Sequence, residues 1–315
     1  MILIVGGAFR IWLSPYTHHV YFDEFTHFDI ALKWTTPDKS ASIARHMPGW
    51  SFLLSLVFFI FGKHVTVAFT FSSVLSILSI LLVYVFIRGF FREGNAPLWG
   101  ALITAVLPLH LRFSASMDTD QISFFFLVLS LVALSFYIRD RGWRQLAFLL
   151  TAGIWSSYIR QENVVFLFLA LISIIIVEIK PVRAGEVNEC GDRGMVHRKC
   201  LSRVMDRKAR FGIVFLLTGL ALLPFYLQNL LGLRQSIYGY YYIEQGVSAG
   251  LGERMLLNFA YFFQNTSHPL FLTVMAMIGA AGLLMTKGKR YLAAATAYWF
   301  IGYFFIYLFI EGHFK

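Results

Sequence analysis

Long uninterrupted apolar runs constrain the fold more than any other feature of this sequence. The clearest run covers residues 65–87 and contains no charged side chain. A helix of about 20 apolar residues is long enough to cross the ~30 Å hydrocarbon core of a bilayer. Several similar runs follow, and charged residues make up only 14% of the chain, against roughly 25% in soluble domains. The sequence therefore predicts an all-α, polytopic transmembrane bundle of about nine spans.

The distribution of basic residues predicts the topology. We read 48–62 as too short to cross the membrane and 145–178 as a hairpin that turns at residues 159–163. Seventeen of the 27 lysines and arginines then fall in loops on one side, and nine of these lie in 179–210 alone. The positive-inside rule makes that side cytoplasmic. The net charge of +10 thus has a topological explanation and predicts no nucleic-acid partner.

The whole chain, 1–315, is predicted to be one transmembrane domain of a multi-pass plasma-membrane protein. Its named parts are an outer catalytic loop with interfacial helices (15–64), a basic cytoplasmic loop (179–210) and an outer aromatic loop (231–268). The two cysteines, Cys190 and Cys200, are too few for a disulfide framework.

Two adjacent acids, Asp23 and Glu24, stand out in the first outer loop. After them Phe25, Phe28 and Leu32 recur at helical spacing, which predicts a short helix lying in the membrane interface. Taken alone, acids before a short helix are most often solvated or favoured by the helix dipole. In so apolar a chain they are also candidates for catalysis.

The predicted topology brings further charged and aromatic residues to the same outer face. These candidate substrate-binding residues are His46, Arg112, Asp118, Asp120, Arg160, Glu162 and Tyr240. Asp118 and Asp120 form a D-x-D triplet that could chelate a divalent cation through oxygen ligands. That motif is weak, so a metal is one alternative and no other cofactor is indicated.

Glycosyl transfer would use these groups in a specific way. A carboxylate acts as general base on the acceptor hydroxyl, and positive charge stabilises the leaving phosphate. An active site outside the cytoplasm has no ordinary supply of nucleotide sugars. The expected partners are therefore a polyprenyl-phosphate-linked sugar, an acceptor of unknown identity and the lipid bilayer.

Four stretches follow one another along the chain: Phe22–Glu24 followed by Asp29–Ala31, His46–Gly49 before a helix ending at Phe61–Gly62, a span ending at Tyr84–Arg88, and Arg112–Ser114 followed by Asp118–Asp120. This ordered set resembles the GT-C superfamily of integral-membrane glycosyltransferases. That group includes protein O-mannosyltransferases, aminoarabinose transferases and RgtA/B/C/D-like relatives.

The resemblance implies roles for several residues. Asp23 would be the general base of an inverting transferase, Glu24 would support it, and Asp118 or Asp120 would supply the second-loop acid. Met47 departs from the family pattern, which often has proline there. The chain also ends at Glu311–Lys315, where the family continues, so a fragment or a minimal version is expected.

Two alternatives to an active transferase remain at this stage. One is a transporter or flippase for a lipid-linked saccharide, and the other is a catalytically inactive binder. Arg10, inside the apolar stretch 1–14, also has two readings. It could snorkel to the interface or face inward as the partner of an anion.

Overall fold

The computed structural model describes residues 1–17, 22–36, 48–91, 94–160, 163–179 and 212, 214 and 216–223. Within these residues the protein is helical throughout and has no strand, as the sequence predicts. The labelled helices are α1 (Ile2–Thr17), α2 (Phe22–Trp34), α3 (Pro48–Phe61), α4 (Val65–Phe90), α5 (Ala96–Val106), α6 (Pro108–Arg112), α7 (Thr119–Asp140), α8 (Trp143–Ile159) and α9 (Asn163–Ile179).

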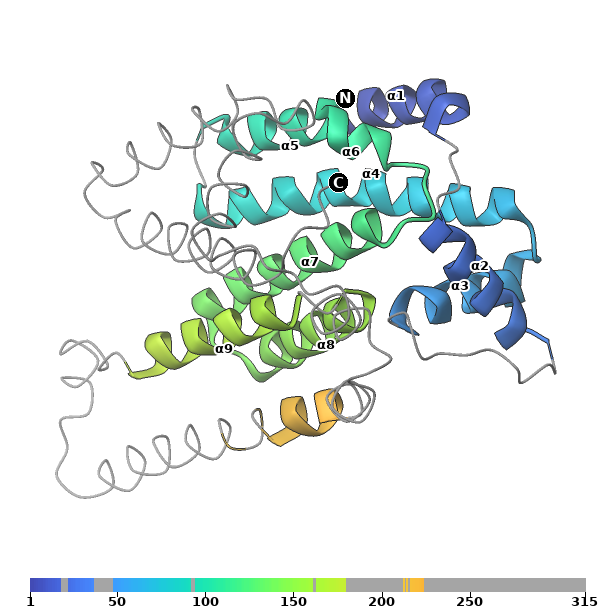
Figure 1. The fold of residues 1–315 in the computed structure, drawn as a ribbon. Helices are drawn as coiled ribbons and strands as arrows, with labels where there is room; N and C mark the ends of the chain where they lie inside the picture. Colours follow the sequence, from blue (N-terminus) through green and yellow to red (C-terminus); the bar gives the residue numbers. More distant parts are fainter. Residues whose placement is uncertain are drawn as a thin grey trace, which may run out of the picture.

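Two helices, α4 and α7, are long and apolar enough to cross a membrane by length and composition. They pack against each other through the middle of the bundle (Figure 1). α1 and α5 pack on α4, while α8 packs on α7 and α9 packs on both. α2 and α3 pack together at one end of α4 (Figure 1). The remaining spans of the predicted nine stay a prediction, as does the division into named loops.

Local sequence explains where several helices break. The apolar run from Ala96 divides into α5 and α6 because Pro108 lacks an N–H and forces Leu107 out of the helical region, to φ −60° and ψ 120°. α3 ends at Phe61, and the next residue, Gly62, takes a positive φ of 94° that a residue without Cβ adopts at no steric cost. The predicted hairpin is confirmed as a helix pair, since α8 ends at Ile159 and α9 begins at Asn163.

Two apolar clusters hold most of the described helices together. One lies between α7, α8 and α9 around Leu149 and Phe166. The other joins α2, α3, the start of α4 and the start of α7 around Trp50, Leu54 and Phe58. This second cluster lies at the end of the bundle where α7 begins, and it fixes the elements that carry the candidate site.

Candidate functional site

Three segments far apart in the sequence meet at the end of the bundle where α7 begins. The indole N–H of Trp50, on α3, donates a 2.7 Å hydrogen bond to the carbonyl of Met117, in the linker before α7. Gly49 packs against the end of α8 so closely that an added Cβ would lie 2.6 Å from the carbonyl carbon and oxygen of Tyr158. The start of α3, the 113–118 linker and the end of α8 therefore form one contiguous unit, which we call the site platform.

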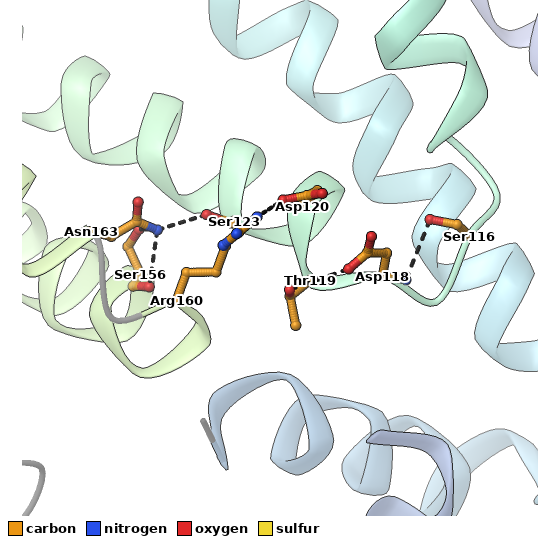
Figure 2. A network of polar contacts seen from close by, with 8 residues as sticks. All are labelled: Ser116, Asp118, Thr119, Asp120, Ser123, Ser156, Arg160 and Asn163. Carbon is orange, nitrogen blue, oxygen red and sulfur yellow. Dashed lines mark hydrogen bonds and ion pairs between the residues drawn. The ribbon is translucent and has the colours of Figure 1, made fainter. Parts of the chain in front are cut away.

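Asp118 occupies the last position before α7. Its backbone N–H donates to Ser116 Oγ at 3.3 Å, and its carboxylate accepts a 3.3 Å hydrogen bond from Thr119 Oγ1 (Figure 2). The carboxylate makes no capping bond to the first turn of α7. Asp118 therefore sits at the N-terminal end of the helix dipole, where a negative charge is stabilised.

Asp120 forms an ion pair with Arg160, whose side chain reaches it from the end of α8 (Figure 2). The expectation that these two residues converge is thus confirmed. The Asp120 side chain is 41% exposed and that of Arg160 34%. A pair this exposed contributes only about 0–1 kcal/mol to stability. Its position is better explained by what it presents at the surface than by what it contributes to folding.

Asn163 supports this ion pair from its buried side, and this role was not predicted from the sequence. The residue is 3% exposed, and its side-chain amide donates to Ser123 Oγ at 2.7 Å and to Ser156 Oγ at 2.9 Å (Figure 2). Ser123 lies one turn after Asp120, and the carbonyl of Ser156 accepts the backbone N–H of Arg160. Asn163 therefore ties α7, α8 and α9 together next to both members of the pair. The polar residue at the start of a largely apolar helix was the sequence signal.

Asp23 and Glu24 lie in the first turn of α2, which begins at Phe22. Their side chains lie outside what the structure describes, so their catalytic roles stay a prediction. The predicted short helix is confirmed, and its place in the membrane interface stays a prediction. Phe25 is exposed, while His27 is buried and its Nδ1 lies 2.9 Å from Ser51 Oγ on α3. The polar side chain of His27, and not Phe25, therefore faces α3.

The other predicted residues divide into two groups. Arg112 is exposed at the end of α6, with its guanidinium carbon 5.7 Å from the centroid of the Phe113 ring. His46, Glu162 and Tyr240 lie outside the described residues. Across the part of the chain that is described, no group of three or more His, Cys, Asp or Glu side chains could hold a metal ion.

The site platform lies inside a recognisable stretch of sequence. Residues 45–184 match the dolichyl-phosphate-mannose-protein mannosyltransferase family. The match supports a GT-C glycosyltransferase. The search of curated proteins found no match, and neither did the search of solved structures.

The mannosyltransferase match covers less than half of the chain, but it contains the whole platform. Asp118, Asp120, Arg160 and Asn163 fall inside it, whereas Asp23 and Glu24 precede it. The predicted resemblance to the GT-C superfamily is confirmed. Together with the two apolar helices, it fits the predicted membrane protein.

Proposed function

We propose that this protein transfers a sugar from a polyprenyl-phosphate donor to an acceptor hydroxyl, in a single inverting step. The observation that carries the proposal is the Asp120–Arg160 pair beside Asp118 on the platform, within residues that match a mannosyltransferase family. That arrangement offers fixed positive charge next to carboxylates at one end of an apolar bundle. A lipid-phosphate sugar needs both features.

Arg160 is proposed to stabilise the leaving phosphate. Asp120 holds the guanidinium at the end of α8, and a planar guanidinium binds phosphate oxygens through fixed N–H donors. Charge that develops on the phosphate as the glycosidic bond breaks is stabilised most by a cation already in place. Arg112, which is exposed at the end of α6 and shortly precedes Asp118 in the sequence, is a second candidate for the same role.

Asp23 is proposed as the general base that removes the proton from the acceptor hydroxyl, with Glu24 supporting it. One displacement at the anomeric carbon needs only one such base. Proton removal by a positioned group typically contributes about 10²–10⁴-fold in rate. His46, Glu162 and Tyr240 complete the proposed substrate-binding set, and a divalent cation at Asp118 and Asp120 is kept as an optional part.

The proposed active site faces outward. Arg88 at the end of α4, Arg139 at the end of α7, and Arg141 and Arg144 around the start of α8 are all exposed. The ends of α4 and α7 lie together, since Gly89 is next to Ser135. These arginines therefore gather at the end of the bundle opposite the platform. The positive-inside rule supports a cytoplasmic location for them.

The experiment uses the purified protein in nanodiscs with radiolabelled mannosyl-phosphoryl-polyprenol and a membrane extract as acceptor source. Asp23→Asn should lower transfer by about 10²-fold or more. Asp29→Asn is the matched control: it makes the same change on the same helix, at a half-exposed ion pair with Lys33, and should leave transfer near wild type.

The outcomes separate the hypotheses. Wild-type turnover in Asp23→Asn would remove Asp23 as the base. Donor binding by the wild-type protein without any transfer would favour a transporter or an inactive binder. Loss of transfer on adding a chelator would establish the cation.

A further inference from the structure

Arg10 is a buried charge that the proposed reaction does not use. It lies on α1, yet only 1% of it is exposed within the bundle. Its Nε donates to Ser76 Oγ on α4 at 2.7 Å, and its Nη1 donates to the carbonyls of Gly6 at 2.7 Å and Ala105 at 3.3 Å. The snorkelling alternative for Arg10 is therefore wrong, because the guanidinium points into the protein.

The fourth contact of Arg10 is with a histidine. Arg10 Nη2 lies 2.5 Å from Nδ1 of His110 on α6. A guanidinium can only donate hydrogen bonds, so Nδ1 of His110 must accept and carries no proton. His110 is therefore neutral and protonated on Nε2. No ion pair found in the described part of the chain includes Arg10.

The far side of His110 meets α7. Its Nε2 lies 3.3 Å from the amide nitrogen of Gln121, which is itself 3.4 Å from Ser79 Oγ on α4. Two donors cannot bond each other, so this contact is a hydrogen bond only when the Gln121 amide is turned by half a turn, with its oxygen toward His110. The turned amide gives up its donation to Ser79 Oγ, which itself donates to the carbonyl of Leu75. His110 precedes the 113–118 linker and Gln121 follows it. The contact between them therefore closes the linker that carries Asp118.

We propose that Arg10 is a positioning residue which, through a neutral His110 and Gln121, sets where α7 begins and so where Asp118 and Asp120 stand. Trp50 holds the middle of the same linker through the Met117 carbonyl. An apolar side chain could attach α1 to α4 without desolvating a charge, and replacing buried charges by packed apolar residues is often neutral or stabilising. Intramembrane arginines are accordingly functional candidates.

The first test measures position without any catalytic assay, so it does not depend on the proposed function. The protein carries Cys190→Ser and Cys200→Ser, with Thr119→Cys as a reporter at the first residue of α7. The rate of maleimide labelling is measured in nanodiscs. His110→Phe keeps a ring against Phe124, 5.2 Å away, but removes both polar contacts. The loss of two interhelical hydrogen bonds of average strength corresponds to about an eightfold faster labelling rate.

Two further variants separate positioning from general destabilisation. His110→Asn keeps an acceptor for Arg10 and a donor for Gln121, and should label within about twofold of the parent. Ile80→Ala removes a fully buried apolar side chain beside Ala101 and Ala105 and leaves every hydrogen-bonding group of Arg10, His110 and Gln121 in place. It should lower the Tm at least as much as His110→Phe while leaving labelling near the parent rate.

The second test reads the transfer reaction and rests on the proposed function. His110→Phe should lower kcat by about tenfold or more, because small misplacements of reacting groups are costly, with a smaller change in donor KM. His110→Asn should recover most of the lost kcat.

Parental labelling in His110→Phe, or equal labelling in His110→Phe and Ile80→Ala at equal Tm, would overturn the proposal. If His110→Phe does not fold, Gln121→Leu breaks the same link from α7 and is judged by the same criteria. Absence of transfer in the wild-type protein would refute the proposed function alone, since the labelling result stands independently.

Discussion

Gly49→Ala should disrupt the site from a position that carries no polar group. An ideal Cβ at this residue would lie 2.6 Å from the carbonyl carbon and oxygen of Tyr158 and 2.9 Å from the backbone nitrogen of Ile159. Ordinary carbon contacts are about 3.5–4.0 Å, so α3 and α8 must separate by roughly 1 Å. The atoms met are backbone atoms, which cannot move aside as a side-chain tip can.

The expected cost has two parts. Inserting a methyl group into a packed contact destabilises by about 1–3 kcal/mol. Arg160 follows Tyr158 by two residues, so a shift of α8 also moves the proposed phosphate ligand. A 1 Å misplacement at a reacting group can cost about 10²-fold in rate. We therefore expect kcat to fall by about 10²-fold, together with a modest fall in Tm.

The assay is mannose transfer and thermal unfolding in nanodiscs, with two glycine controls. Gly7→Ala places its Cβ 3.6 Å from Ile77 Cδ1, an ordinary contact, and should change neither quantity. Gly153→Ala meets Leu167 Cδ1 at 2.7 Å, a flexible tip, so it should lower Tm more than kcat. Wild-type kcat and Tm in Gly49→Ala would refute the close-contact reasoning. A fall in Tm with unchanged kcat would refute the link to Arg160.

Three further substitutions test the platform itself. Arg160→Gln should lower Tm very little, because the pair that Arg160 forms with Asp120 is half-exposed and contributes about 0–1 kcal/mol. Transfer should nevertheless fall by about 10²-fold, and unchanged transfer would remove Arg160 as the phosphate ligand. Asn163→Leu should lower the free energy of unfolding, measured by chemical denaturation, by about 1–3 kcal/mol, since Ser123 and Ser156 lose their buried partner. An unchanged free energy of unfolding would show that other contacts replace those of the amide. Trp50→Phe keeps an aromatic ring stacked on Phe71 but leaves the Met117 carbonyl without its 2.7 Å donor. The free energy of unfolding should therefore fall by about 1–3 kcal/mol in the same measurement, and wild-type stability would argue that other contacts hold the linker.

Features that depend on length and charge could be predicted from the sequence. The helix over 65–87 follows from an unbroken apolar run, and the α8–α9 hairpin follows from the need to place basic loops on one side. That hairpin in turn brought Arg160 to the end of the bundle where Asp120 lies. The convergence of these two residues, 40 positions apart, was therefore accessible to charge counting alone.

Features that depend on side-chain packing could not be predicted. Phe25, Phe28 and Leu32 recur at helical spacing on α2, but this pattern does not say which side chains meet protein: Phe25 is exposed, whereas His27 is buried. The expectation that apolar side chains are buried inside the protein has little predictive value next to lipid, because the hydrocarbon outside the bundle is as apolar as the core. Polar side chains are the ones that must find protein partners, as His27 finds Ser51. The contact of Arg10 with a histidine 100 residues away has no sequence signal of comparable strength.

The energetics of the platform suggest why its visible ion pair is not what holds it in place. Asp120 and Arg160 gain too little from their half-exposed contact to fix two helices. The contacts that can do so are buried and lie behind the pair: the backbone approach at Gly49, the amide of Asn163 and the indole of Trp50. A surface charge held by a rigid, buried frame loses little entropy when it binds an anion, since it is already in place. It follows that variants of the frame should impair transfer while leaving the charges intact, and variants of the charges should impair transfer while leaving the frame intact.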